Sequence, residues 1–440
     1  MNANKVLRPS TDSAITRRDF VRSAAATATA GALAATALGR PRSTRRRDTV
    51  RVGLIGCGGR GTGAAAQALS ADPDILLWAM GDAFGDQLET ALDRLGQHDD
   101  AARIDVPAER RFSGFDNYKA VIDSGVDVVI LATPPVFRPA HLAYAIERGK
   151  HVFCEKPVAV DAPGIRRVIE LAGQARQKNL RLMSGFCWRY SQPQRATYAK
   201  LHAGAIGEIR TIQTTYLTSP LADVPRKSGW TDMEWQIRNW KAFTWLSGDH
   251  IVEQAIHAID WIPWALNGEL PVRGWGNGGR QCREGEWTGD MFDHFSICYE
   301  FAGGARAFHA CRQIANCHND NSAYFMGTEG FCRSEPWRPD CIIENNGMEM
   351  WRYEGENNNM YQTEHDELFA AIREDQPINE GVAMAHSTML GIMGRMCAYT
   401  GRLLTWNECL NSQDSLTPDH WAWGEAPVPV VAKPGVTPFV

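Results

Sequence analysis

Six residues near the start of the chain, Gly-Cys-Gly-Gly-Arg-Gly at 56–61, have the types and spacing that hold phosphate groups. In such a loop Gly56 allows a tight turn, Gly58 lets the backbone approach a pyrophosphate, and Gly61 permits a helix to pack closely on a strand. The amides at the start of the following helix are then open to the phosphates. Glycines occur in many turns, so the flanking residues decide whether this loop binds a dinucleotide.

The flanks favour the dinucleotide. Residues 50–55 and 75–80 are short apolar runs of the kind that buried parallel strands require, and the second run ends at Asp82. A carboxylate at that place accepts hydrogen bonds from the adenine-ribose hydroxyls and repels a 2′-phosphate. The sequence therefore predicts NAD as cofactor and makes NADP less favourable, although Arg60 in the loop tempers that preference.

The alternation of strands and helices continues along the chain. Residues 126–132, 151–154 and 180–186 are predicted strands, and 139–149 and 163–178 are predicted helices. Ligands of such sheets bind beyond the carboxyl ends of the strands. The residues expected to contact the cofactor there are Gly56, Gly58, Gly59, Arg60, Gly61, Asp82, Thr133, Pro134, Glu155, Lys156 and Arg189.

Four of these motifs together resemble one known family. They are the glycine loop, Asp82, ATPP at 132–135 and GKHVFCEKP at 149–157, and SGDHIVEQAIHAID at 247–260 adds a fifth. The set is similar to the Gfo/Idh/MocA oxidoreductases, named after glucose–fructose oxidoreductase and inositol dehydrogenase. The resemblance implies a doubly wound Rossmann sheet, followed by an α/β domain on a large open, mostly antiparallel sheet that often packs against another subunit.

The resemblance also implies a catalytic group of Lys156, Glu253 and His257. Glu253 and His257 are four residues apart, so in one helix they share a face. The imidazole would take a hydroxyl proton while hydride leaves the same carbon, with Glu253 orienting the ring and Lys156 holding the hydroxyl. The spacing alone is equally compatible with a structural role, in which His257 is a core histidine bonded to a neighbouring carbonyl. Glu253 stands where the family usually has Asp.

Beyond residue 190 the pattern changes to that of half-exposed antiparallel strands. Residues 209–217, 294–301 and 305–314 mix apolar and polar positions, and Gly303-Gly304 is a hairpin signal. Helices are expected at 364–375 and 380–400. The predicted organisation is a Rossmann domain at 49–187, an α/β domain for substrate and oligomerisation at 188–410, and an extended tail at 411–440. A homo-oligomer, dimer or tetramer, follows from the open sheet.

The expected substrate is a carbohydrate or glycoside. Lys156 and His257 would touch it, together with Tyr190, Arg238 and Trp240, because a sugar pocket needs planar stacking and bidentate hydroxyl partners. The net charge of −5 argues against nucleic acid as a partner, no stretch is apolar enough to predict a membrane span, and the cysteine spacings predict no metal site.

The first forty residues read as a targeting signal. Arg17 and Arg18 precede an Ala-rich run from Ala24 to Leu38, which resembles a twin-arginine (Tat) export signal at 1–40, followed by a basic linker at 41–48. The protein is then expected outside the cytoplasm, in the periplasm or beyond, after export in folded form. Because no NAD pool exists there, the cofactor is expected to be inserted before export and to stay tightly bound.

Three functions fit these observations. The first is an exported NAD-dependent oxidoreductase that acts on a CH–OH group of a sugar or glycoside and gives a keto-sugar. The second is an NAD-dependent glycoside hydrolase of the family 109 type, which works by transient oxidation and elimination; AIHAI at 255–259 replaces the stretch usual there. The third is a non-catalytic sugar-binding protein, which the presence of Lys156 and His257 disfavours.

Overall fold

A computed structural model of the chain describes residues 48–337 and 341–440. The predicted Tat signal and almost all of the predicted linker lie outside the described residues. Thr49–Val440 form one compact unit that holds two sheets, and the boundary at 187/188 stays a prediction. Within the described residues, no helix combines the length and the apolar character needed to cross a membrane.

The first sheet is parallel throughout and has the predicted doubly wound order, β3-β2-β1-β4-β5-β6. Its central strands are buried on both faces and consist mainly of Val, Ile, Leu and Phe, as parallel strands covered by helices must. The strands are β1 (Val50–Ile55), β2 (Ile75–Asp82), β3 (Arg111–Ser113), β4 (Val128–Leu131), β5 (His151–Cys154) and β6 (Leu182–Ser184).

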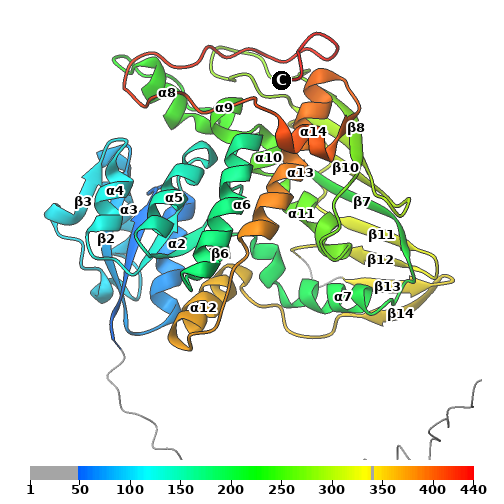
Figure 1. The fold of residues 1–440 in the computed structure, drawn as a ribbon, viewed down its shortest axis with the longest axis horizontal. Coiled ribbons are helices and arrows are strands. Elements are labelled where there is room, and N and C mark those ends of the chain that lie inside the picture. The colour runs from blue at the N-terminus through cyan, green and yellow to red at the C-terminus, as the bar shows by residue number, and fades with distance from the viewer. Residues whose placement is uncertain (1–47, 338–340) are drawn as a thin grey trace, which may run out of the picture. The chain divides into compact units, whose positions relative to one another are not determined.

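Five helices connect these strands and cover the sheet (Figure 1). They are α2 (Gly59–Ala71), α3 (Gly85–Leu95), α4 (Asn117–Asp123), α5 (Arg138–Glu147) and α6 (Ala162–Gln177). The β3 strand and the helices on either side of it were not predicted. The reason for β3 is physical: it has three residues and no buried side chain, so it lacks an apolar pattern.

The second sheet is mostly antiparallel, as expected. Its order is β14-β13-β12-β11-β7-β10-β9-β8-β15 among the described residues, and β7 and β10 are its parallel pair. The hairpin signal at Gly303-Gly304 is confirmed by the antiparallel pairing of β9 and β10. The strands are β7 (Ile209–Thr218), β8 (Arg273–Gly279), β9 (His294–Glu300), β10 (Arg306–Gln313), β11 (Ala323–Gly327), β12 (Phe331–Ser334), β13 (Ile342–Asn345), β14 (Met348–Arg352) and β15 (Leu404–Thr405).

Helices from the second half of the chain join the two sheets. Helix α12 packs on α2 and α13 packs on α6, so both contact the Rossmann helices (Figure 1). A single cluster of buried apolar side chains extends from the first sheet through α11 and α13 to the second sheet. These helices are α7 (Gln192–His202), α8 (Asp232–Arg238), α9 (Thr244–Ser247), α10 (His250–Glu253), α11 (Ile256–Ala265), α12 (Met360–Arg373), α13 (Gly381–Thr400) and α14 (Trp406–Asn411).

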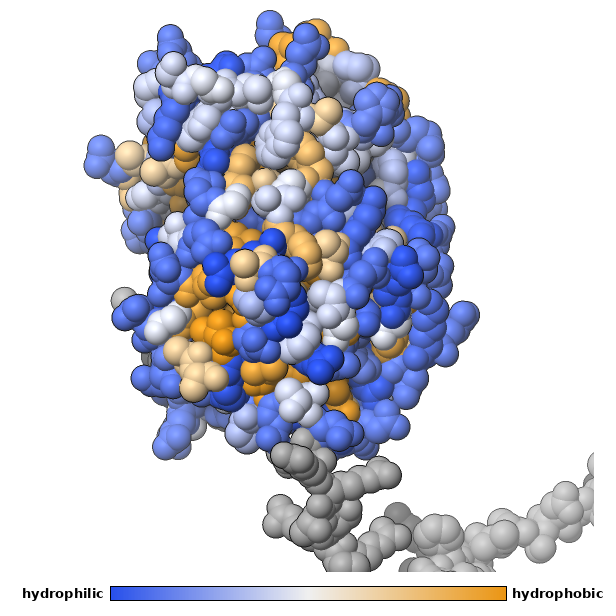
Figure 2. Space-filling model, turned by 90° about the vertical axis from the view of Figure 1, so that its left-hand side faces the viewer, coloured by the Kyte–Doolittle hydropathy of each residue, from blue (hydrophilic) through white to orange (hydrophobic). Residues whose placement is uncertain are grey.

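The tail after α14 has no regular structure and runs over the top of the molecule in Figure 1, near α8 and α9. It brings its own apolar residues to a second, smaller hydrophobic cluster that also contains Phe137, Ile237 and Phe243. On the side of the molecule that carries β3, apolar residues gather in the middle of the face and hydrophilic residues frame them (Figure 2).

Candidate functional site

The glycine loop has the geometry that a dinucleotide needs. Gly56 has φ +96°, and a Cβ there would lie 2.6 Å from the carbonyl carbon of Ala132. A Cβ on Gly61 would overlap the carbonyl oxygen of Gly56, whereas Gly58 and Gly59 face open space. Gly58 precedes the first turn of α2 without a capping side chain, so the helix amides are free to bind phosphate.

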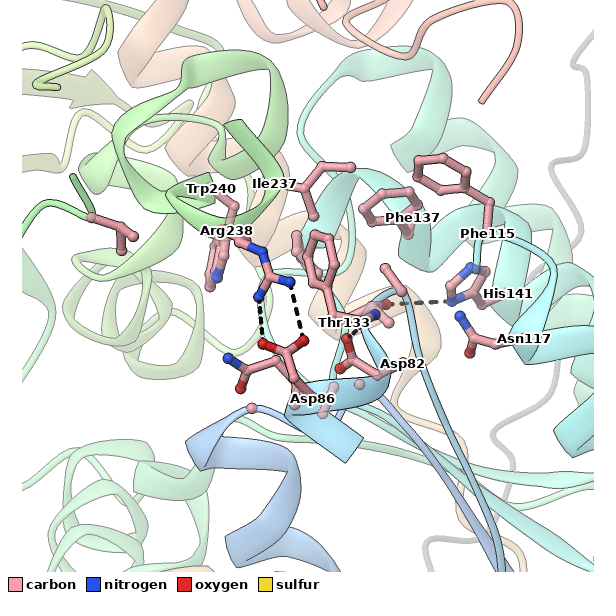
Figure 3. Close-up of a pocket in the computed structure, with 18 of the residues that line it drawn as sticks. Asp82, Asp86, Phe115, Asn117, Thr133, Phe137, His141, Ile237, Arg238 and Trp240 are labelled. Atoms are coloured by element: carbon pink, nitrogen blue, oxygen red, sulfur yellow. Dashed lines mark hydrogen bonds and ion pairs between the residues drawn. The ribbon is translucent and has the colours of Figure 1, made fainter. Parts of the chain in front are cut away.

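A cavity of ≈ 370 Å³ opens beside this loop at the carboxyl ends of the strands. Gly56, Gly58, Asp82, Thr133 and Pro134 line it, as the sequence predicted for cofactor contacts (Figure 3). A volume of this order suits a ligand such as the adenosine half of a dinucleotide. The donor set, the open glycines and the acid therefore fit NAD.

Asp82 ties the loop to the second strand. Its Oδ2 accepts a hydrogen bond from the Cys57 amide at 2.7 Å and its Oδ1 accepts one from the Phe84 amide at 2.9 Å. Burial raises the pKa of this carboxyl, and the two backbone donors oppose that effect. Each oxygen keeps a further lone pair, so the side chain can still accept ribose hydroxyls.

Replacing Asp82 with serine should shift cofactor preference toward NADP. The substitution removes the charge that would repel a 2′-phosphate, and Arg238 lies close enough to act on Asp82 electrostatically. Both affinities should fall, because one hydroxyl cannot replace two acceptors for Cys57 and Phe84, but the ratio of the NADP to the NAD dissociation constant should decrease. Equal affinities for NAD and NADP in the unmodified protein would contradict the role given to Asp82.

Arg60 and Glu155, both expected at the cofactor, bind each other instead of lining the cavity. Arg60 Nε lies 2.7 Å from Glu155 Oε1, and the guanidinium stands 5.1 Å from the ring centroid of Tyr361. Glu155 is 3% exposed. The pair links the glycine loop to the end of β5, so its contribution to the cofactor site is to hold the two loops together.

Arg138, which sequence reasoning missed, joins the ends of β4 and β5. Its buried guanidinium donates to the carbonyls of Thr133 at 2.8 Å and Glu155 at 3.0 Å, and also to that of Pro157. Burial lowers the pKa of this guanidinium. The side chain thereby fixes the backbone on both sides of Lys156. No sequence pattern marks an arginine in a first helical turn for such a role.

Lys156 contacts Glu253, one of its predicted catalytic partners, through the Glu253 backbone carbonyl. The Lys156 ammonium donates to the backbone carbonyl of Glu253 at 2.7 Å. Burial lowers the pKa of Lys156, against the opposing charges of Glu253 and Glu155. The ammonium of Lys156 also acts on His257 electrostatically. That Lys156, Glu253 and His257 form one catalytic group stays a prediction.

The expectation that Glu253 and His257 share one helix is wrong. Helix α10 ends at Glu253 and α11 begins at Ile256, because the amides of Gln254 and Ala255 both donate to the His250 carbonyl. The His257 amide then meets the Gln254 carbonyl at 3.5 Å instead of that of Glu253. This break leaves the Glu253 carbonyl free to accept the hydrogen bond from Lys156.

The imidazole of His257 is packed between aromatic rings and keeps a free nitrogen. Its ring centroid lies 5.0 Å from that of Trp188 and 6.1 Å from that of Phe186. Its buried Nδ1 has no hydrogen-bond partner among the described residues. Burial and the charge of Lys156 hold the pKa of His257 well below its usual value. The ring is therefore neutral near pH 7 and able to accept a proton.

The structure gives Arg189 and Tyr190 structural partners. Arg189 binds both carboxylate oxygens of Asp260, at 2.7 and 2.8 Å, and the Tyr190 hydroxyl donates to Glu380 at 2.7 Å. Tyr190 is 3% exposed. These contacts turn both side chains toward α11 and α13, and the roles of Arg189 at the cofactor and of Tyr190 at the substrate stay predictions.

Replacing Asp260 with alanine should destabilise the fold by about 3–5 kcal/mol, because it leaves the guanidinium of Arg189 without its buried partner. Urea unfolding measures this loss. Glu367, which pairs with Arg195 at 2.5 and 3.0 Å, is the matched control. Both of those side chains are 40% exposed, so Glu367→Ala should cost less than about 1 kcal/mol. Equal losses in the two variants would refute the structural role of Asp260.

Arg238 and Trp240 were expected at the substrate, and the structure places them in the wall of the cofactor cavity with Asp82 (Figure 3). Arg238 binds both oxygens of Asp86, at 3.0 Å each, and lies 3.8 Å over the ring of Phe84. The reason is the path of the chain: the segment before α9 folds back over the Rossmann sheet, which a linear sequence pattern does not show.

A glycine loop on an open helix end, an acid after the second strand, and a lysine and histidine beyond the strand ends define the class of a dinucleotide-dependent oxidoreductase. Residues 50–186 match the oxidoreductase family with an NAD-binding Rossmann fold, and residues 195–333 match the C-terminal domain of the same family. The chain belongs to the Gfo/Idh/MocA family of oxidoreductases.

Individual relatives are distant. An inositol 2-dehydrogenase of Rhizobium meliloti is 26% identical over 67% of this chain and 78% of its own length. An uncharacterized oxidoreductase of Streptococcus pneumoniae is 27% identical over 40% of this chain, and the match spans only 44% of that relative. The solved structure of a levoglucosan dehydrogenase, in complex with NADH and levoglucosan, shares the fold with a TM-score of 0.63 at 20% identity, over 81% of this chain and 99% of that one.

Proposed function

We propose that this protein oxidises a secondary alcohol of a sugar, polyol or glycoside to a ketone, with NAD as hydride acceptor. The observation that carries the proposal is that Lys156, directly after β5, donates to the Glu253 carbonyl at the end of α10 and acts through its charge on His257 in α11. The glycine loop and Asp82 at the neighbouring strand ends line a cavity that fits NAD. The inositol 2-dehydrogenase relative supports a polyhydroxylated substrate.

Each side chain has a distinct task in this reaction. Neutral His257 would accept the proton of the substrate hydroxyl. NAD, when bound, would supply the hydride acceptor. Lys156 stays on the substrate oxygen and stabilises the developing alkoxide. The Glu253 carbonyl aims the ammonium of Lys156. Trp188 and Phe186 exclude water from one face of the imidazole.

A small polar cavity next to the catalytic group supports a substrate with several hydroxyls. Its lining residues include Glu253, His250, Asn239, Lys241 and Gln313 beside apolar ones such as Leu221 and Met291, and its volume of ≈ 10 Å³ has room for about one water or one hydroxyl group. Carboxylate, amide and ammonium groups converging on such a space are typical partners of a sugar hydroxyl.

The test begins with the protein as purified. It is denatured, released NAD(H) is identified by mass spectrometry, and products from a panel of polyols, sugars and glycosides are analysed by NMR. A ketone together with reduced cofactor supports the proposal. Free sugar without net oxidation would replace it with the glycoside hydrolase function of the family 109 type. Absence of both products and of bound cofactor would leave only a sugar-binding protein.

Export is part of the proposal. Arg17 and Arg18 ahead of an Ala-rich run support a route through the Tat pathway. The folded protein would then carry NAD out of the cytoplasm. Cell fractionation should find it in the periplasm, and Arg17→Lys with Arg18→Lys should retain it in the cytoplasm. The pair of variants accumulating in the periplasm at the normal level would refute this route.

We also propose a homo-oligomer formed through the second sheet. Phe308 on β10 and Met326 on β11 are 42% and 41% exposed on the face turned away from the core. Burying that face between two copies would remove apolar surface from water. Sedimentation should show a dimer or tetramer, and Phe308→Asp with Met326→Asp should give a monomer. A monomer at micromolar concentration in the unmodified protein would refute the proposal.

A further inference from the structure

The cofactor cavity has two walls of different origin. The Rossmann sheet supplies one, through the glycine loop, Asp82 and the end of β4. The other comes from residues 224–240, a segment far along the chain from the Rossmann strands. Its side chains that line the cavity are those of Val224, Lys227, Trp230, Ile237, Arg238 and Trp240. Figure 3 shows Ile237, Arg238 and Trp240 across the cavity from Asp82 and Thr133.

The second wall is fastened to the first by Arg238. Its guanidinium binds both carboxylate oxygens of Asp86 in the first turn of α3, and a second carboxylate, that of Glu234, fixes Arg238 Nε at 3.0 Å. The guanidinium also covers the ring of Phe84, at 3.8 Å from the centroid. A bidentate pair of this kind sets direction as well as distance.

The C-terminal tail holds the second wall from outside. The amide of Met233 in α8 donates to the Gly424 carbonyl at 3.0 Å, and Gln236 Nε2 donates to the Pro427 carbonyl at 3.0 Å. Both donors belong to the helix that carries Arg238. Two backbone carbonyls of the tail therefore join it by hydrogen bonds to α8, the helix that carries Arg238.

Two tryptophans of the tail also bind the Rossmann side. The ring of Trp421 lies 4.2 Å from that of Phe137, and the ring of Trp423 lies 4.4 Å from that of Phe115 and 5.4 Å from that of Phe84. All three phenylalanines line the cavity. The tail thus bridges both walls, over the end of the cavity where Asp82 marks the adenine ribose.

We propose that residues 421–427 and 224–240 form a clamp that retains the adenosine half of the dinucleotide. The clamp depends on the proposed function in one respect, namely that the protein binds NAD. A bound adenosine can leave only after the aromatic contacts of Trp421 and Trp423 or the Arg238–Asp86 pair open. The clamp slows release of the cofactor more than it changes hydride transfer, since it lies at the Asp82 end and not at Lys156.

The test measures cofactor release from the full-length protein. NADH is loaded, and its dissociation is followed by nicotinamide fluorescence after mixing with lactate dehydrogenase and pyruvate, which oxidise free NADH. Trp421→Ala with Trp423→Ala should release NADH at least about tenfold faster, since the ring contacts with Phe84, Phe115 and Phe137 are lost. The matched control is Val428→Ala with Val430→Ala in the same tail, where the side chains are 84% and 73% exposed; its release rate should not change.

Two further variants protect the result against a folding defect. Trp421→Phe with Trp423→Phe keeps aromatic contacts and should restore most of the slow release. Arg238→Met opens the other fastening without touching the tail and should also accelerate release. Unchanged release in both the alanine pair and Arg238→Met would overturn the clamp. Failure of the unmodified protein to bind NADH at all would instead refute the proposed function.

Discussion

Replacing His257 with alanine is expected to lower kcat by roughly 10²–10⁴-fold, the usual contribution of a positioned acid–base group. The variant should fold and retain NAD, because the imidazole lies outside the cofactor cavity and its Nδ1 supports no other residue. The measurement is kcat on the substrate found by product analysis, with bound NAD quantified in the same sample. His202→Ala, at an exposed histidine bonded to the Trp264 carbonyl, is the control.

The pH profile of the unmodified enzyme reports the same group. Only the neutral imidazole accepts a proton, so activity is lost as the pH falls through the pKa of His257. Burial and Lys156 hold that pKa well below 6.5, so the acidic limb of kcat/KM should lie below pH 6.5. A limb above pH 6.5, or full activity per folded molecule in His257→Ala, would show that the base is another group.

Replacing Gly61 with alanine should weaken NAD binding by about 10–100-fold, which corresponds to about 1.4–2.8 kcal/mol. The new Cβ would overlap the Gly56 carbonyl oxygen and would stand 3.1 Å from the Ala132 side chain. The backbone cannot yield there without moving the turn that faces the pyrophosphate. Isothermal titration with NAD measures the affinity, and thermal unfolding of the apoprotein measures the cost to the fold.

Gly63→Ala is the matched control for this prediction. Gly63 lies in the same helix, and its nearest neighbour is the flexible Arg60 guanidinium at 3.7 Å. Alanine is the better helix former, so this variant should bind NAD normally and should be slightly more stable. Normal NAD affinity in Gly61→Ala would mean that the loop does not contact the cofactor as proposed.

Parts of the fold with a strong local pattern were predictable from sequence. Strand β5 occupies the predicted residues His151–Cys154, because a short apolar run between a helix-ending glycine and a polar segment fits only a buried parallel strand. The position of Asp82 at the end of the second strand was equally predictable, since an apolar run ends just before it. Both features depend on neighbours in sequence.

Features that depend on distant residues could not be predicted. The break between α10 and α11 occurs in an apolar stretch whose pattern predicts one helix. Two distant residues bind this break: Lys156 donates to the Glu253 carbonyl and Gln313 donates to the Gln254 side chain. Arg238 was assigned to the substrate because nothing in the chain near it reveals Asp86 as its partner. Long-range pairing, and not local propensity, decided both cases.

The clamp has a consequence for how the holoprotein is made. A ribosome releases the glycine loop and Asp82 well before residues 411–440, so one wall of the cavity exists while the tail is still being synthesised. Once Trp421 and Trp423 settle against Phe137 and Phe115, entry of a dinucleotide requires them to separate again. Loading of the cofactor is therefore easiest before the tail settles, and nucleotide supplied to the folded apoprotein should be taken up slowly, at the rate at which the tail detaches.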